Sequence, residues 1–307
     1  MRTIKTAVVT GPTGGLGHAL CAKLLSEGIK VYAVVHPGSK RVDTLPDGIQ
    51  RTDCDLSEMK TLPDRISSAD AMFHLAWSNT VGAGRNDMYA QVENIQYTLD
   101  TCHAAAELGC KVFVGAGSQA EYGRTNAALT PDTPCFPETG YGMAKLCAGQ
   151  MSRFECAKLG VDHVWSRILS AYGPFSEEKS MLLTTARTLL AGEKPSLTAG
   201  EQLWDYLYVD DAAEALFRLA LYGYSGRIYP VGSGSIRPLR EYVGILRDAV
   251  DPSLCVGFGE VPYGEKQLMH LEADISELKE DTGFKVKIDF AEGSRRLIEW
   301  LRGNNNA

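Results

Sequence analysis

The chain has 307 residues, 44% of them hydrophobic, so it is long enough to bury a large core. It carries 31 basic and 38 acidic residues, a net charge of −7, and no dense basic run that would neutralise a phosphate backbone. Nucleic acid is therefore excluded as an expected partner. The apolar stretch in "MRTIKTAVVT" is too short for a signal peptide, and no later segment approaches ~18 uninterrupted apolar residues. We expect a cytoplasmic protein with no membrane contact.

The eight cysteines show no pattern of metal ligands. They form no CxxC pair, have no histidine at zinc spacing, and lie mostly inside apolar periodic segments. We expect reduced thiols in the core and no metal site.

Strands and helices alternate along the first part of the chain. Runs rich in Val and Ala predict strands at 5–10, 30–35, 71–76, 111–116 and 163–168. Helices are predicted at 15–27, 85–108, 141–159, 178–191 and 210–221. Apolar strands separated by helices imply a parallel sheet covered on both faces. The predicted fold class is α/β, a Rossmann-like doubly wound parallel sheet.

Beyond about residue 170 this alternation loosens into short strands, proline turns and a terminal helix, "FAEGSRRLIEWLR". We predict a main domain at 1–170 and a smaller mixed α/β region at 171–307, some elements of which return to the main sheet. Ligands of doubly wound sheets bind at the carboxyl ends of the strands. The smaller region is therefore expected to bind substrate over that edge.

A glycine turn, "VVTGPTGGLGHAL", joins the first strand to the first helix. Gly11 permits the tight turn, Gly14 lets a pyrophosphate approach the backbone, and Gly17 lets helix and strand pack closely. The helix N-terminus would receive the anion. The pattern predicts an NAD(P)-binding domain at 1–170, the alternative being a purely structural turn.

The end of the second strand bears on the choice of dinucleotide. An acidic residue there would hold the ribose hydroxyl of NAD, but Val35 stands at that position. The residues that follow are suited to a 2′-phosphate: His36, Ser39, Lys40 and Arg41. NADP(H) is therefore favoured, and NAD(H) remains possible because an ordinary solvated loop would have the same sequence.

A tyrosine and a lysine four residues apart open the helix at 141–159. Tyr141 and Lys145, in "ETGYGMAKLCAG", would project from one face. A tyrosine with an unperturbed pKa of about 10 exchanges protons poorly at neutral pH, and a nearby ammonium would stabilise its phenolate. Ser118, where the strand at 111–116 ends, is either a turn residue or a hydroxyl that polarises a carbonyl. Together with the glycine turn, these residues predict carbonyl–carbinol chemistry.

Seven segments in order carry a family resemblance over nearly the whole chain. The sequence resembles the extended short-chain dehydrogenase/reductases, the NAD-dependent epimerase/dehydratase family, in its nucleotide-sugar modifying branch. The segments are "TGPTGGLG", "CDLSE", "FHLAW", "GSQAEYG", "YGMAK", "AYGP" and "YLYVDDAAEAL". The resemblance implies that Ser118 hydrogen-bonds the reacting oxygen, that Tyr141 is the general acid/base, and that Lys145 lowers its pKa and holds the nicotinamide ribose.

The resemblance also implies the binding residues. Asp55 and Leu56 would lie beside the adenine ring, and Leu75 and Ala76 would line the cofactor. The other predicted cofactor contacts are Gly11, Thr13, Gly14, Gly15, Leu16, Gly17, His36, Ser39, Lys40, Arg41, Tyr141 and Lys145. The predicted substrate contacts are Trp77, Ser78, Gln119, Ser170 and Trp204. Asn94 resembles the family's helix asparagine, or is an ordinary helix-surface residue.

The residues after Ser118 bear on the reaction. Dehydratases of this family need additional acid/base groups directly after the Ser/Thr, whereas Gln119 and Ala120 transfer no protons. Glu121 is one residue later and, by strand alternation, is expected to point to the opposite side. Elimination is therefore disfavoured.

The substrate end departs from the family pattern. Ser170 stands where epimerases usually have Asn, and Trp204 where they have the Arg that holds a diphosphate. Compensation is expected from Lys194, Arg237 or Lys266, or from stacking of Trp204, which is alternatively a core aromatic.

The predicted function is NADP(H)-dependent reduction of a 4-keto-6-deoxysugar nucleotide, with Tyr141 as proton donor. The alternatives are an NAD-dependent nucleotide-sugar 4-epimerase and a reductase of a non-nucleotide carbonyl. A non-catalytic NADP sensor would not need Ser118, Tyr141 and Lys145. By resemblance, a homodimer is expected through the helices at 85–108 and 141–159, unless those faces pack only within the monomer.

Overall fold

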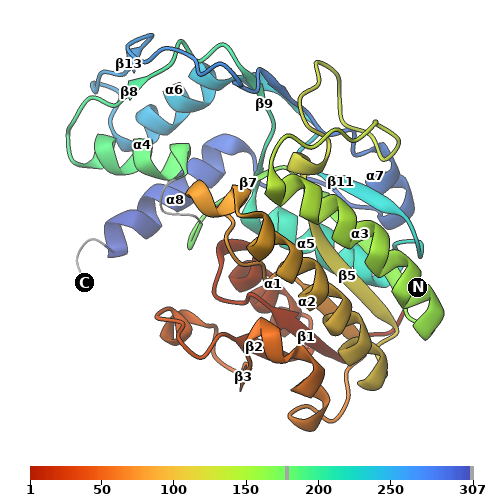
Figure 1. Cartoon of the computed structure of the whole chain (residues 1–307). Helices are drawn as coiled ribbons and strands as arrows, with labels where there is room; N and C mark the ends of the chain where they lie inside the picture. The colour runs from red at the N-terminus through yellow and green to blue at the C-terminus, as the bar shows by residue number, and fades with distance from the viewer. Residues whose placement is uncertain (177–179, 305–307) are drawn as a thin grey trace.

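The computed structural model describes residues 1–176 and 180–304, and a sheet of seven parallel strands lies at its centre (Figure 1). The strand order is β11-β6-β5-β4-β1-β2-β3. The strands are β1 (Thr6–Thr10), β2 (Lys30–Val35), β3 (Gln50–Asp53), β4 (Ala71–His74), β5 (Val112–Ser118), β6 (Asp162–Ile168) and β11 (Ile228–Val231). All six pairings are parallel, which confirms the predicted α/β fold class.

Two strands of this sheet were not predicted. β3 is a mostly exposed edge strand of sequence QRTD, without the apolar run that marks its neighbours. β11 joins the other edge through β6 and contains Pro230. Proline is tolerated on an edge strand because one side of that strand has no neighbour that needs a backbone N–H donor.

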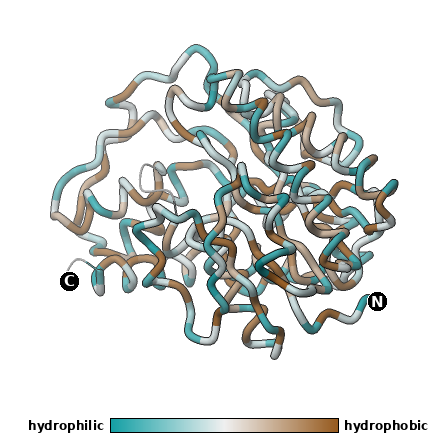
Figure 2. Tube along the Cα trace, turned by 60° about the horizontal axis from the view of Figure 1, so that its bottom comes forward, coloured by the Kyte–Doolittle hydropathy of each residue, from teal (hydrophilic) through white to brown (hydrophobic). Residues whose placement is uncertain are grey.

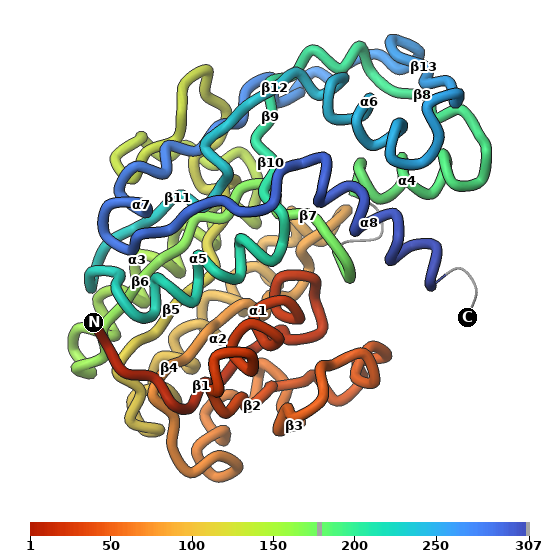
Figure 3. The backbone as a smooth tube through the Cα atoms, turned by 180° about the vertical axis from the view of Figure 1, so that it is seen from behind, coloured from red at the N-terminus to blue at the C-terminus, as the bar shows by residue number. Residues whose placement is uncertain are grey.

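Two layers of helices cover the sheet. α1 (Gly15–Ser26) and α5 (Val209–Tyr222) lie on one face, and α2 (Met88–Glu107) and α3 (Gly140–Leu159) lie on the other (Figures 1 and 3). These helices agree with the predicted ones to within a few residues. The predicted helix at 178–191 corresponds to α4 (Met181–Leu190), and the beginning of its range lies outside the described residues.

The chain beyond residue 170 combines small sheets with helices and also contributes to the main sheet. β7 (Ser170–Tyr172) pairs with β10 (Tyr206–Tyr208) at the carboxyl edge. Further short strands are β8 (Ser196–Leu197), β9 (Leu203–Trp204), β12 (Arg237–Pro238), β13 (Gly257–Phe258) and β14 (His270–Leu271). The helices are α6 (Leu239–Val250), α7 (Ser276–Thr282) and the predicted terminal helix, α8 (Phe290–Asn304). The division at residue 170 stays a prediction.

The core lies between the sheet and its helices. The inner strands are buried on both faces, and Figure 2 shows hydrophobic stretches along the closely packed central segments. In the described ranges no helix is long and apolar enough to span a membrane. The cytoplasmic location stays a prediction.

Candidate active site

The glycine turn between β1 and α1 has the geometry of an anion cradle. Gly11 has φ +68°, and a Cβ there would lie 2.9 Å from the Ala76 nitrogen. A Cβ on Gly17 would lie 2.1 Å from the Gly11 oxygen, so only glycine lets the helix pack here. At Gly14 the nearest atom would be 3.7 Å away, which leaves space above the turn. No side chain caps α1 and its first turn holds no acidic residue, so the residues present fit a dinucleotide pyrophosphate.

A groove of about 550 Å³ extends from this turn along the carboxyl ends of β1, β2 and β4. It is lined by many of the predicted cofactor and substrate residues: Gly11, Thr13, Gly14, Gly15, His36, Ser39, Arg41, Asp55, Leu56, Leu75, Ala76, Trp77 and Ser78. Leu16, Gly17, Lys40, Tyr141 and Lys145 are not among its lining residues. We call it the cofactor groove. It lies beside β1, where the strand order reverses and where doubly wound sheets bind their ligands.

Tyr97 and Phe175 also line the cofactor groove and were not predicted. Phe175 stacks on His18 of α1, with 4.1 Å between ring centroids. Its position directly after "AYGP" was the available sequence signal for Phe175. Tyr97 lies on α2, where one tyrosine among many helical residues gave no signal.

The loop after β2 presents a mixed set of charges to the groove. His36 Nε2 lies 3.2 Å from an Asp55 carboxylate oxygen, and Arg41 donates a hydrogen bond of 3.3 Å to the Phe175 carbonyl. Ser39 Oγ donates to Thr13 Oγ1 at 3.5 Å. Lys40 is exposed and lies outside the groove lining. Of the predicted cationic cluster, His36 and Arg41 thus reach the groove and Lys40 does not.

Tyr141 and Lys145 lie on the first turns of α3, beside the end of β5 that carries Ser118. α3 begins here because Thr139 caps it, accepting a hydrogen bond from the Gly142 nitrogen. Burial raises the pKa of Tyr141, and the hydrogen bond with the Ser118 side chain lowers it. Ser118 Oγ also accepts a hydrogen bond of 3.2 Å from the Ala120 nitrogen. The three predicted catalytic residues are therefore together.

Lys145 is buried and faces aromatic and backbone groups. Its ammonium donates a 2.6 Å hydrogen bond to the Ala116 carbonyl and lies 3.7 Å from the centre of the Trp77 ring. Burial lowers its pKa to about 7, against the opposing attraction of Glu121. Burial also lowers the pKa of nearby His74 to about 3, so that this imidazole is neutral.

Glu121 is fully buried and held by four hydrogen bonds. It accepts bonds from the Ser118 nitrogen at 2.8 Å, from Trp165 Nε1 at 3.0 and 3.2 Å, and from Arg167 Nε at 2.7 Å. It lies on a short 3-10 turn, η4 (Gln119–Glu121), so the strand alternation assumed for it was wrong. The turn brings its carboxylate to Trp165 and Arg167 of β6, where it also holds Ser118 through the Ser118 nitrogen.

The loop after β4 is tied to α2 by two buried polar side chains. Asn94 Oδ1 accepts hydrogen bonds of 2.9 and 3.1 Å from the nitrogen and Oγ of Ser78. Gln91 Oε1 accepts one of 2.9 Å from Trp77 Nε1. Asn94 is 1% exposed, so the helix-surface alternative for it is wrong.

Trp204 and Ser170 form a hydrogen-bonded pair beyond the cofactor groove. Trp204 Nε1 donates to Ser170 Oγ at 2.8 Å. Both residues line a cavity of about 400 Å³ that also includes Gly15 and Leu16. Trp204 is half-buried and packs against the core as well as lining this cavity, and Gln119 lines none of the cavities described here.

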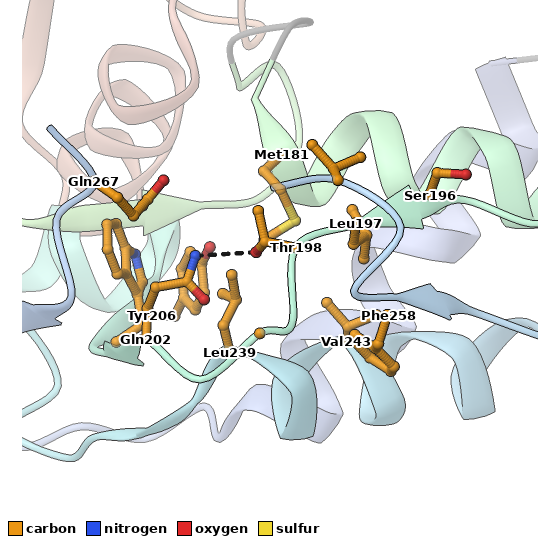
Figure 4. A pocket seen from close by; sticks show the side chains of 13 residues that line it. Met181, Ser196, Leu197, Thr198, Gln202, Tyr206, Leu239, Val243, Phe258 and Gln267 are labelled. Atoms are coloured by element: carbon orange, nitrogen blue, oxygen red, sulfur yellow. Dashed lines mark hydrogen bonds between the residues drawn. The ribbon is translucent and has the colours of Figure 1, made fainter. Parts of the chain in front are cut away.

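A further cavity of about 320 Å³ shares Met181, Trp204 and Tyr206 with this one (Figure 4). Its walls are mainly apolar and come from α4, α6, β8, β13 and the loop after β13: Met181, Leu197, Leu239, Val243, Phe258 and Val261. Gln202 donates a 3.3 Å hydrogen bond to Thr198 inside it. Within the described ranges no charged side chain belongs to its lining. We call it the distal cavity.

The lysines and the arginine expected to compensate for the missing family arginine do not line the distal cavity. Lys194 forms an ion pair with Glu260, and Lys266 and Arg237 are exposed. Among the residues that the structure describes, no group of three or more His, Cys, Asp or Glu side chains is placed to hold a metal ion.

Comparisons with known proteins agree with this geometry. A model of the NAD dependent epimerase/dehydratase family matches residues 7–232. A dTDP-glucose 4,6-dehydratase of Streptomyces griseus is 24% identical over 95% of this chain and 93% of its own. The UDP-N-acetylglucosamine 4-epimerase of Methanobrevibacter ruminantium, solved with UDP-N-acetylmuramic acid, superposes with a TM-score of 0.88 at 24% identity, over 99% of this chain and 100% of its own.

Another solved structure, that of RMD from Pseudomonas aeruginosa complexed with NADPH, has a TM-score of 0.83 and 21% identity. The alignment covers 98% of this chain and 99% of that one. Both solved structures share the fold of this chain over essentially its whole length. This protein is therefore an enzyme of the NAD-dependent epimerase/dehydratase family, as its motifs predict.

Proposed function

We propose that this enzyme is an NADP(H)-dependent reductase of a 4-keto-6-deoxysugar nucleotide. The observation that carries the proposal is the set of proton-transfer groups around Ser118. Tyr141 lies beside it, whereas Gln119 and Ala120 transfer no protons and the Glu121 carboxylate is engaged by Arg167 and Trp165. This set suits protonation of one oxygen and lacks the additional acid/base group that elimination needs.

The residues at hand account for the proton transfer. Ser118 Oγ accepts from the Ala120 nitrogen and hydrogen-bonds with Tyr141, and its hydroxyl hydrogen would donate to a substrate oxygen once substrate is bound. Tyr141 would give its proton to the same oxygen. Lys145, whose ammonium lies 5.8 Å from the centre of the Tyr141 ring, would assist and hold the cofactor's ribose. Bound cofactor in the groove would supply the hydride.

The substrate class is inferred from relatives. The Streptomyces protein is a dTDP-glucose 4,6-dehydratase and the Methanobrevibacter protein is a UDP-N-acetylglucosamine 4-epimerase, so both act on nucleotide sugars. We test the proposal by following NADPH oxidation by purified enzyme with dTDP-, UDP-, CDP- and GDP-linked 4-keto-6-deoxysugars. Consumption of NADPH with formation of the 4-hydroxy product supports it, and inertness toward all four sinks it.

An epimerase is a second candidate, since the Methanobrevibacter structure is one. An epimerase would retain a tightly bound cofactor through purification and interconvert two 4-hydroxy sugars with no net change in NADPH. A third candidate, reduction of a non-nucleotide carbonyl, is favoured by the uncharged lining of the distal cavity. Turnover of simple ketones with no response to any nucleotide sugar would support it.

We propose that Arg41 recognises the 2′-phosphate of NADP(H), because it lines the groove beyond β2 and because β2 ends in Val35 where NAD-binding domains have an acidic residue. Arg41→Ala is expected to raise KM for NADPH about tenfold, the loss of one charge-assisted contact, and to change KM for NADH less than about twofold. Steady-state kinetics with both cofactors check this. The control is Arg295→Ala on α8, which removes the same charge from an exposed helix. Equal effects on both cofactors would contradict the assignment.

We also propose a homodimer through α2 and α3. Tyr89 is 88% exposed, Val92 61% and Phe154 70%, which leaves an apolar surface over both helices. Phe154→Asp combined with Val92→Asp is expected to halve the mass measured by light scattering. Tyr224→Asp, an exposed aromatic off these helices, is expected to leave the mass unchanged. An unaltered mass in the double variant would exclude this interface.

A further inference from the structure

Arg85 lies against the face of the Tyr141 ring. Its guanidinium carbon is 4.3 Å from the ring centroid, which is cation–π distance. Arg85 belongs to a short 3-10 turn, η3 (Gly82–Asn86), in the loop that connects β4 to α2. The sequence motifs do not include it, and its contact with Tyr141 arises from two segments far apart in the chain.

The arginine is held in place from several sides. Arg85 Nη1 donates a 2.9 Å hydrogen bond to the Thr80 carbonyl. The Asn86 Oδ1 next to it accepts a 3.0 Å bond from the Gly140 nitrogen, which ties η3 to the first turn of α3. Gln91, 1% exposed, donates a 3.0 Å bond to the Gly84 carbonyl. The guanidinium is therefore fixed relative to the helix that carries Tyr141.

Three charged side chains lie near the Tyr141 phenol: Glu121, Lys145 and Arg85. Glu121 from η4 disfavours the phenolate, but its carboxylate is paired with Arg167 of β6. Lys145, on α3 itself, lies 5.8 Å from the Tyr141 centroid and faces the Trp77 ring more closely. Burial brings the pKa of Lys145 to about 7, so near neutral pH its charge is only partly present. Arg85 keeps its charge throughout this range because an arginine does not deprotonate in proteins.

We propose that Arg85 is a positioning residue for the proton donor, stabilising the Tyr141 phenolate through the face of its ring. The inference rests on the proposed role of Tyr141 as the acid. Burial raises the pKa of Tyr141, and Arg85 acts against that rise together with Ser118. The chain thus applies two cations to one phenol, a lysine from the same helix and an arginine from the loop after β4.

The test is a titration of Tyr141 that needs no substrate. The near-ultraviolet absorbance of phenolate is followed against pH for the protein, Arg85→Gln and Arg85→Lys, each after subtraction of the same chain carrying Tyr141→Phe. The apparent pKa of Tyr141 is expected to rise by about one unit in Arg85→Gln, and by less in Arg85→Lys, which keeps the charge. Arg295→Gln removes the same charge from α8 and is expected to leave it unchanged.

An unshifted titration in Arg85→Gln would overturn the inference, because a purely structural arginine would alter the unfolding temperature and leave this pKa in place. If Arg85→Gln does not fold, Arg85→Met supplies the same measurement with the aliphatic stem retained. Failure of the proposed function is read separately. Turnover that survives Tyr141→Phe would remove Tyr141 as the acid, whatever the titration shows.

Discussion

Replacing Tyr141 by Phe is expected to lower kcat at least about a thousandfold, because we propose that the phenol beside Ser118 donates the proton in the reaction. Phenylalanine keeps the ring that contacts Arg85 and Trp77 and removes the hydroxyl alone. Binding of NADPH is expected to change by less than about twofold, since Tyr141 is not in the groove lining. Stopped-flow rates check the loss of turnover, and fluorescence titration of NADPH checks that cofactor binding is retained.

The control for this variant is Tyr224→Phe, which removes a phenol hydroxyl from an exposed ring far along the chain. It is expected to turn over at the parent rate. If Tyr141→Phe kept more than about a tenth of the parent kcat, the proton would have to come from another group or from water, and Ser118 would be the nearest candidate. A second variant, Ser118→Ala, would then be informative.

The main sheet was predictable because burial on both faces leaves a continuous apolar run. β1, β2, β4, β5 and β6 were found in this way. β3 was missed because an exposed edge strand of Gln, Arg, Thr and Asp lacks that run. α6 was missed because it follows proline turns that suggested irregular structure, although its buried residues recur at helical spacing.

The site was predictable where its chemistry follows from spacing along one element. The glycine turn and the pair Tyr141 and Lys145 are of this kind. The contact of Arg85 with Tyr141 and the hydrogen bonds that hold Glu121 join segments far apart in the chain, and a single sequence shows neither. The strand alternation assumed for Glu121 does not apply, because the chain turns into a 3-10 helix directly after Ser118.

The buried ion pair below Ser118 gives the second large effect. Arg167 is 2% exposed and Glu121 is fully buried, and Arg167 Nε lies 2.7 Å from Glu121 Oε2. Arg167→Met is expected to lower the free energy of unfolding by about 3–5 kcal/mol, because it leaves a carboxylate in the interior without its counter-charge. Urea unfolding followed by circular dichroism measures the loss. Arg124→Met, which breaks an exposed pair with Glu138, is expected to cause no measurable change.

The double variant Arg167→Met with Glu121→Gln separates the two causes of this loss. If the loss comes from the unpaired carboxylate, the double variant is expected to regain a large part of the stability, since a neutral amide costs less to bury and still accepts a bond from the Ser118 nitrogen. Its kcat is expected to stay below the parent's, because Arg167 no longer fixes the turn that holds Ser118, although Trp165 can still donate to the amide oxygen. The guanidinium carbon of Arg167 also lies 4.4 Å from the centre of the Tyr122 ring. Equal losses of stability in the single and double variants would mean that Arg167 acts through packing on Tyr122 and that its charge pairing with Glu121 does not stabilise the fold.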